Sequence, residues 1–186
     1  SQWSDTDEDG YGDSPSGVNG DQCPGVYGTS TEDRLGCLDS DADGWSNPST
    51  SWGADSGADA FPGEVTQHAD ADGDGYGDNP TGFQADMCPE EAGASNADRY
   101  GCSDDDGDGW SNEGDAFPTE STQHADTDSD GYGDSIDGFE GDSCPQVPGD
   151  SNQQKFGCAD LDGDGWDDET DAFPQNSLFW SDGDGD

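Results

Sequence analysis

Residues 67–122 read QHADADGDGYGDNPTGFQADMCPEEAGASNADRYGCSDDDGDGWSNEGDAFPTEST, and residues 123–178 keep the same order of Asp, Gly, aromatic and Cys positions. The first Asp residues of the two segments, Asp70 and Asp126, lie 56 residues apart, and such a fixed period indicates a tandem array. From Asp5 to Asp70 the spacing is 65, because residues 48–58 form a Ser/Gly-rich insertion that we predict to be a surface loop. The sequence divides into repeat 1 (1–66), repeat 2 (67–122), repeat 3 (123–178) and the start of a fourth (179–186). We therefore expect self-association, or continuation into a longer repetitive chain or fibre.

The composition excludes several classes of partner. The chain carries 47 acidic and 3 basic residues, a formal net charge of −44, which argues against nucleic acid or an anionic membrane as a partner and favours cations. No apolar run approaches the roughly 20 residues of a membrane span. Only 26% of the residues are hydrophobic, so apolar burial alone offsets little conformational entropy. We expect another source of stability.

Regular secondary structure is predicted to be scarce. Thirty Gly and ten Pro interrupt every segment, and no helical or alternating apolar pattern extends far. The expected fold is mostly irregular loop, arranged as tandem repeats in an extended rod that metal ions and disulfides stabilise.

Each repeat contains two Asp-rich loops with the spacing of a calcium-binding loop. We call them the Tyr loops (residues 5–13, 70–78 and 126–134) and the Trp loops (residues 39–47, 104–112 and 160–168). Side chains at positions 1, 3, 5 and 9 and the backbone carbonyl at position 7 converge on one cation, and Gly at position 6 permits the sharp bend. Most Asp residues fall on these positions and no Glu does, so the acidic excess is positional.

The predicted ligands follow from this numbering. In the Tyr loops they are Asp5, Asp7, Asp9, Tyr11, Asp13, Asp70, Asp72, Asp74, Tyr76, Asp78, Asp126, Asp128, Asp130, Tyr132 and Asp134. In the Trp loops they are Asp39, Asp41, Asp43, Trp45, Asn47, Asp104, Asp106, Asp108, Trp110, Asn112, Asp160, Asp162, Asp164, Trp166 and Asp168. The incomplete fourth repeat adds Asp182, Asp184 and Asp186.

The last ligand of each loop is less regular. Asp115 and Asp171 occupy position 12 of two Trp loops, whereas in repeat 1 the insertion displaces this ligand to Asp59 or Asp55. Position 12 of the Tyr loops varies, but an Asp always follows position 9 by eight residues. These residues, which either close the shell or bridge a second ion, are Asp21, Asp86 and Asp142.

Calcium fits this donor set better than other common metals. Each loop supplies five or six oxygens, whereas Mg²⁺ keeps several waters and Zn²⁺ prefers Cys and His. His68 and His124 occupy the position held by Trp3 and Trp180 in the other repeats, so we interpret them as packing residues. We expect about six or more calcium ions for the whole chain.

The cysteines predict three disulfides, since each repeat contains one pair 14 residues apart: Cys23 with Cys37, Cys88 with Cys102, and Cys144 with Cys158. Disulfides imply an oxidising, extracellular compartment. Metal–thiolate sites are the competing interpretation, but C-x-x-C spacing is absent.

Two further sets of residues recur in the repeats. The basic residues Arg34, Arg99 and Lys155 all lie three positions before the second Cys, and we predict ion pairs with carboxylates of a neighbouring loop. Aromatic residues are expected to cluster between the ions, with Phe61, Phe117 and Phe173 packing against the rings at position 7.

Tandem D-x-D-x-D-G loops, Cys-Pro after the Tyr loop and Gly-Cys before the Trp loop resemble thrombospondin type 3 repeats over nearly the whole chain. The resemblance implies little regular secondary structure, a chain wrapped around calcium ions with the loop Asp residues as ligands, and a role in extracellular adhesion or architecture. The Tyr loops depart from that pattern through insertions before Cys-Pro, such as residues 14–22.

The leading functional hypothesis is a secreted or cell-surface structural protein, a rigid stalk or fibre segment stabilised by Ca²⁺ and disulfides. The alternative is a cell-surface adhesion module in which the insertion, with Trp52, contacts a protein or glycan partner. An enzyme is disfavoured, because no nucleophile is placed with a base and the His residues occupy equivalent positions in the repeats.

Overall fold

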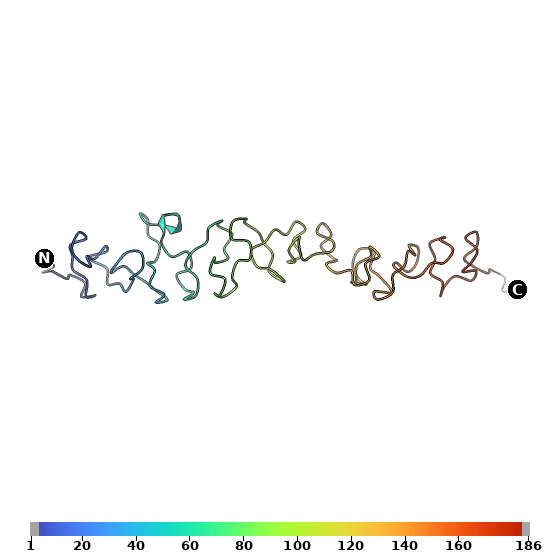
Figure 1. Cartoon of the computed structure of the whole chain (residues 1–186), viewed down its shortest axis with the longest axis horizontal. Helices are drawn as coiled ribbons and strands as arrows, with labels where there is room; N and C mark the ends of the chain where they lie inside the picture. Colours follow the sequence, from blue (N-terminus) through green and yellow to red (C-terminus); the bar gives the residue numbers. More distant parts are fainter. Residues whose placement is uncertain (1–3, 184–186) are drawn as a thin grey trace. The chain divides into compact units, whose positions relative to one another are not determined.

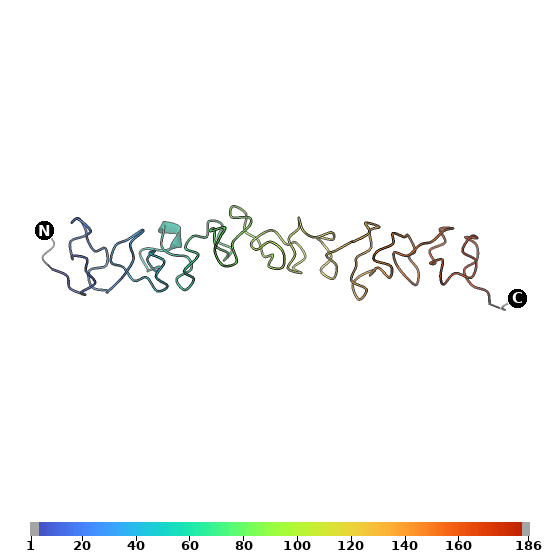
Figure 2. The same cartoon turned by 60° about the horizontal axis from the view of Figure 1, so that its bottom comes forward.

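The computed structural model describes residues 4–183, and these residues form almost entirely irregular structure (Figures 1 and 2). Within the described residues the one helix is a short 3₁₀ turn, η1 (Ala54–Ser56), in the insertion of repeat 1. Paired backbone occurs as isolated bridges, such as those of Gly12 with Gly20 and Gly77 with Ala85. The prediction of a mostly irregular, loop-rich fold is confirmed.

The chain divides into two compact units, which we describe separately. Unit 1 comprises Ser1–Ala94 with Arg99–Cys102, and unit 2 comprises Ser95–Asp98 with Ser103–Asp186. The Tyr loop of repeat 3 and the Trp loops of repeats 2 and 3 lie in unit 2; the other three loops lie in unit 1.

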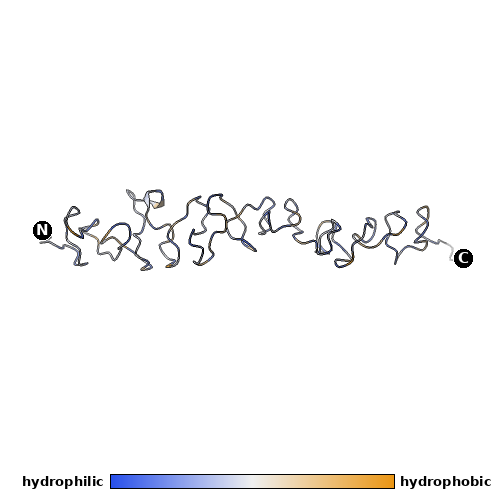
Figure 3. Ribbon diagram, viewed as in Figure 1, coloured by the Kyte–Doolittle hydropathy of each residue, from blue (hydrophilic) through white to orange (hydrophobic). Residues whose placement is uncertain are grey.

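Neither unit has an ordinary hydrophobic core among its described residues. The buried apolar residues are Cys37, Ala58, Cys102 and Cys158, whereas the buried polar residues include six Asp of the predicted sites and two Gln. Figure 3 accordingly shows hydrophilic colours along most of the trace, with hydrophobic colour in short stretches. None of the described residues forms a helix of the length and apolarity needed to cross a membrane. Polar and covalent interactions must therefore stabilise the fold.

The three predicted disulfides are present, joining Cys23 to Cys37, Cys88 to Cys102 and Cys144 to Cys158. In repeats 1 and 3 a buried Ser supports the bridge, because Ser30 Oγ and Ser151 Oγ each accept the N–H of the second Cys at 2.9 Å. Three disulfides in one chain indicate an oxidising environment.

Two buried glutamines organise the segment that follows a Tyr loop. Gln123 is 1% exposed; its Oε1 accepts the N–H of Ser135, and its Nε2 donates to the carbonyls of Ser135 and Phe139. Gln67 makes the equivalent three bonds with Asn79 and Phe83. Each amide thereby satisfies backbone groups that would otherwise be buried without partners.

Replacing Gln123 by Ala should destabilise unit 2 by about 2–3 kcal/mol, because two carbonyls and one N–H lose their partner. Chemical denaturation of both proteins in the same buffer measures the change. Gln154, which is exposed, provides a matched control, and its replacement by Ala should leave stability within about 0.5 kcal/mol of the parent. Equal effects of the two substitutions would contradict the proposed role of Gln123.

The aromatic rings pair differently from our prediction. At position 7 of the Trp loops, Trp45 stacks on His68, Trp110 stacks on His124 and Trp166 stacks on Trp180, at centroid distances of 4.3, 4.5 and 5.9 Å. In the Tyr loops, Tyr76 contacts Tyr100 and Tyr132 contacts Phe156. Phe173 contacts Phe179 instead of a ring at position 7. The interpretation of both His as packing residues is confirmed, and the contact of Phe173 with Phe179 was not predicted.

Candidate metal centres

All six Asp-rich loops share one backbone conformation. The Gly at position 6 has a positive φ in every loop, between 95° and 99°, in Gly10, Gly44, Gly75, Gly109, Gly131 and Gly165. A side chain at this position would strain the backbone, because L-residues rarely adopt such angles. The D-x-D-x-D-G spacing thus specifies the bend expected from the sequence.

Hydrogen bonds between residues close in the sequence orient the carboxylates. At position 1, Asp5 Oδ1 accepts the N–H of Glu8 and Asp5 Oδ2 that of Gly10, and the equivalent pair of bonds occurs in the other five loops. At position 9, one side-chain oxygen accepts the N–H of position 2, as in Asp13 with Thr6. At position 5, one oxygen accepts the N–H of position 7. These bonds orient the carboxylates, and an oxygen that accepts a single bond keeps a lone pair for another partner.

The carboxylates at position 3 have buried oxygens with no hydrogen-bond partner. At least one such oxygen occurs in each of Asp7, Asp41, Asp72, Asp106, Asp128 and Asp162. In at least five of the loops, oxygens from positions 1, 3 and 5 lie within 4.8 Å of one another, the first of these groups being Asp5, Asp7 and Asp9. Oxygens bound to one Ca²⁺ at 2.3–2.6 Å are at most about 5 Å apart, so this separation suits a shared cation.

One further Asp closes each site in the same way. Its N–H donates to the carbonyl of position 8, and its Oδ1 accepts the N–H two residues further on, as in Asp142 with Gly133 and Cys144. We call these residues the closing Asp. They are Asp21, Asp86 and Asp142 for the Tyr loops and Asp59, Asp115 and Asp171 for the Trp loops.

The closing Asp are buried, with exposed fractions of 0–8%, and in four of them Oδ2 has no hydrogen-bond partner. The two kinds of loop, which differ in the sequence distance to this residue, therefore have the same arrangement. Asp21, Asp86 and Asp142, left open in the sequence as shell-closing or bridging residues, lie where they can complete the shell of their own loop.

Asp59, and not Asp55, takes this position in repeat 1. Asp59 is fully buried and donates its N–H to Ser46, the position 8 residue, whereas Asp55 is exposed on η1. The insertion begins after Asn47 and ends before Asp59, and contacts within it include the bridge between Ser49 and Trp52 and the hydrogen bond from the N–H of Ala58 to the carbonyl of Gly53. The insertion thus preserves the site while adding surface.

The Gly-Cys pairs are explained by the closing Asp of the Tyr loops. A Cβ at Gly36, Gly101 or Gly157 would lie 2.2–2.6 Å from Oδ1 of Asp21, Asp86 or Asp142, respectively, and these glycines have φ between 72° and 76°. A larger residue before the second Cys would displace this carboxylate.

Clustering and burial perturb the closing Asp electrostatically. Burial raises the pKa of Asp59 to about 6, the N–H of Phe61 opposes this, and the charges of Asp43, Asp41 and Asp39 add to it. Burial likewise raises the pKa of Asp21, Asp86, Asp115 and Asp142. Concentrated like charge in a dry site is unfavourable without a counter-ion, so these sites favour either protons or a cation.

This competition predicts an effect of pH on repeat 1. If this Trp loop binds a divalent cation, its affinity for the cation should fall as the pH is lowered through about 6, because Asp59 must lose its proton to bind. In the presence of a chelator, the stability of the folded chain should change with pH in the opposite direction. The pKa of Asp59 in the folded chain exceeds the ordinary value of 3.8, so protonated Asp59 stabilises the fold. This contribution is fully present below about pH 3.8 and is lost as the pH rises through about 6. Calcium titrations and unfolding curves between pH 4 and 7.5 measure both effects. Asp59→Asn should remove them and Asp55→Asn should not.

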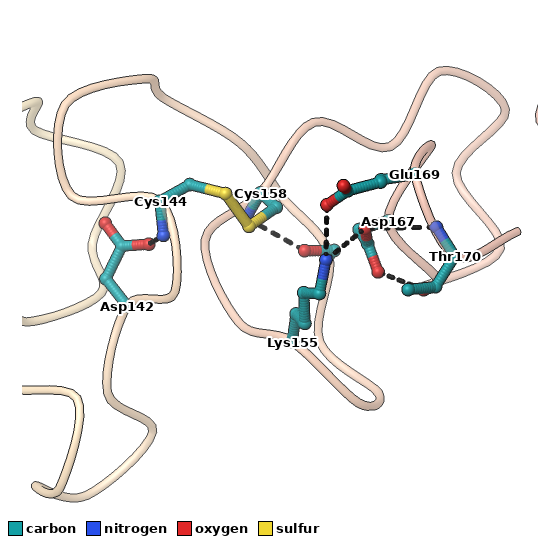
Figure 4. Close-up of polar contacts among 8 residues, drawn as sticks. Asp142, Cys144, Lys155, Cys158, Asp167, Glu169 and Thr170 are labelled. Carbon is teal, nitrogen blue, oxygen red and sulfur yellow. Dashed lines mark hydrogen bonds and ion pairs between the residues drawn. A yellow bond between two sulfur atoms is a disulfide. The ribbon is translucent and has the colours of Figure 1, made fainter.

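The basic residues have different partners in different repeats. Lys155 Nζ lies 3.1 Å from Asp167 Oδ1 and 2.7 Å from Glu169 Oε2, so the predicted ion pair with the neighbouring loop is present in repeat 3 (Figure 4). Hydrogen bonds from Lys155 and Thr170 lower the pKa of Asp167 despite its burial. Arg34 instead donates to the carbonyl of Gln22 and lies over the Trp52 ring at 5.5 Å. The insertion in repeat 1 supplies this different partner.

A further carboxylate beside the Trp loops of repeats 1 and 2 was not foreseen. In repeats 1 and 2, Asp33 and Asp98 accept the N–H and hydroxyl of the Ser at position 8, Ser46 and Ser111. In repeat 3, position 8 is itself an acid, Asp167, and Gln154 takes the place of Asp98. The repeats thus change two positions together: Asp98 and Ser111 in repeat 2 become Gln154 and Asp167 in repeat 3. This joint change is visible in the sequence, but only the contacts between the two positions explain it.

Of the predicted ligands in the fourth repeat, Asp184 and Asp186 lie outside the described residues, and Asp182 is exposed. The Tyr and Trp residues at position 7 donate their N–H groups to position 5, as described above, so their backbone follows the loop as expected.

The donor set of each loop consists of carboxylate or amide oxygens and backbone carbonyls. Among the described residues the cysteines are all in disulfides, which leaves no thiolate donor, and both His rings are engaged in stacking on Trp rings. Such all-oxygen sites with unpaired buried oxygens fit a hard divalent cation. The chain matches no model of a known protein family, and a search of curated protein sequences finds no match.

Proposed function

We propose that this chain is an extracellular structural protein in which calcium ions, one or more per Asp-rich loop, and disulfides replace a hydrophobic core. The observation that carries the proposal is the set of buried carboxylate oxygens without partners, which occurs at position 3 of every loop and in four closing Asp. Burying such charges costs several kcal/mol each unless a counter-ion is present. Calcium is the hard cation whose size and coordination number suit five or six protein oxygens.

Mechanically, bound calcium would couple the two ends of each site. The loop residues and the closing Asp are separated by eight or more residues in the Tyr loops, so one ion holds the intervening segment in place. Binding free energy then becomes folding free energy. Successive repeats stiffened in this way would form a semi-rigid stalk or fibre segment. The proposed role is structural and not enzymatic.

Titration of the oxidised, chelator-treated chain with Ca²⁺ tests this proposal. We expect six or more tightly bound ions, together with a cooperative fall in hydrodynamic radius and a gain in protease resistance, all reversed by EDTA. Mg²⁺ at equal concentration is the control and should not produce the same change. One or two weak ions without a conformational change would refute the calcium-dependent structure and leave an acidic spacer.

Adhesion is the second candidate, favoured by the ordered insertion in repeat 1. Its Trp52 is anchored by Asp33 through Nε1 at 3.2 Å and by the guanidinium of Arg34, so the insertion is built as part of the unit. Deleting residues 48–58 should abolish attachment to a surface partner while calcium stoichiometry is unchanged; retained attachment would exclude the insertion as the adhesive element.

A further inference from the structure

An aromatic groove with an acidic rim lies in unit 2, between the end of repeat 2 and the Tyr loop of repeat 3. The groove encloses about 290 Å³, and the residues that line it include Phe117, Tyr132 and Phe139 together with Glu120 and Glu140. Phe139 is 61% exposed. Three rings beside two carboxylates in one hollow form a surface suited to an organic cation, which aromatic faces and carboxylates both attract.

The backbone presents Phe139 rigidly. Its N–H donates to Thr122 Oγ1 at 2.8 Å, and its carbonyl accepts Nε2 of the buried Gln123 at 3.1 Å. The next residue, Glu140, has a φ of 47°. Burial is the main cause of the raised pKa of Tyr132, and the negative charge of Glu140 is the second cause, which places this carboxylate near the Tyr132 hydroxyl. Two hydrogen bonds therefore fix the backbone that carries this exposed phenyl ring, next to an acidic residue, and an exposed aromatic side chain on a fixed backbone is a suitable contact point.

The groove varies among the repeats at two positions. Repeat 2 has Phe83, 62% exposed and bonded to Thr66 as Phe139 is to Thr122, followed by Gln84; repeat 1 has Val18 and Asn19. Gln84 and Asn19 share the positive φ of Glu140, at 45° and 54°. The chain itself thus shows that Val and Gln fit these two positions without changing the backbone.

We propose that this groove binds a Lys or Arg side chain from a basic segment of a partner protein. Charge complementarity supports this occupant, because the chain has a net charge of −44. A second copy of the chain is a poor source, since its three basic residues all have internal contacts: Lys155 with Asp167, Arg34 with Trp52 and Arg99 with Cys88. The partner is therefore a different protein.

The test uses the full oxidised chain, saturated with calcium, at physiological salt. A short blocked peptide with one central lysine between glycines is titrated while the ring resonances of Phe139 and Tyr132 are followed by NMR. We expect these resonances to shift, Phe139→Val and Glu140→Gln each to weaken binding about three- to five-fold, and Glu90→Gln, with the same change of charge at an exposed site in repeat 2, to have no effect. The peptide with acetylated lysine should not bind.

Three outcomes would overturn the proposal. Equal binding by all variants would show diffuse attraction to a polyanion, and binding of the acetylated peptide would exclude a cation site. Tighter binding of tetramethylammonium than of the peptide would assign the groove to a small quaternary ammonium ligand. Calcium stoichiometry is measured on the same samples, and we expect it to be unchanged in every variant. Failure at the groove is thereby distinguished from failure of the calcium sites.

Discussion

Asp142→Asn should remove most of the calcium affinity of the Tyr loop of repeat 3. Asp142 is 1% exposed, its Oδ1 is already bonded to the N–H of Cys144, and Oδ2 is buried without a partner. Asn retains the shape but loses the charge, so the shell keeps one carboxylate fewer. Loss of an outer-shell partner alone costs about 10–100-fold in metal affinity, and we expect at least the upper end of that range for a direct ligand. Isothermal titration should show one fewer tight site.

The matched control is Asp137→Asn. Asp137 occupies position 12 of the same loop, counted from Asp126, and would be the last ligand if the loop followed the twelve-residue template. It is exposed, so its replacement should leave stoichiometry and affinity unchanged. The reverse result, with Asp137 essential and Asp142 dispensable, would refute the assignment of Asp142 as the closing Asp of this loop.

Removing the disulfide of repeat 3 by replacing Cys144 and Cys158 with Ser should destabilise unit 2 by about 3 kcal/mol. The bridge spans 14 residues and constrains the unfolded chain, an entropic gain of about that size for such a loop. It also holds the segment that positions Asp142, since the N–H of Cys144 bonds to that carboxylate (Figure 4). Calcium affinity of the same Tyr loop should therefore fall as well.

Denaturant unfolding with and without calcium separates the two effects. The variant lacking Cys88 and Cys102 is the control: it should lose comparable stability in unit 1 but keep the calcium affinity of the Tyr loop of repeat 3. Unchanged unfolding of unit 2 after loss of its disulfide would mean that calcium alone determines its stability.

The sequence by itself determined the local parts of this protein. Positions 1, 3, 5, 6 and 9 of each loop are linked by hydrogen bonds that span two to seven residues, so their spacing specifies them, as the six positive φ angles from Gly10 to Gly165 show. The disulfide pairing was predictable for the same reason, because each repeat holds one pair of Cys. Scarcity of helix and strand followed from Gly and Pro content.

Only the tertiary structure decided which residues return to these loops. Three contacts depend on how the intervening segments fold back. Asp59, and not Asp55, is buried at its site, His68 stacks on Trp45, and the amide of Gln123 supports a turn 12 residues away. Lys155 pairs with Glu169, but in repeat 1 the insertion begins at the equivalent position and supplies no acid there. Arg34 therefore packs over Trp52 of the insertion. Such contacts depend on loop geometry and on competition for buried polar partners, which the spacing of residues along the chain does not encode.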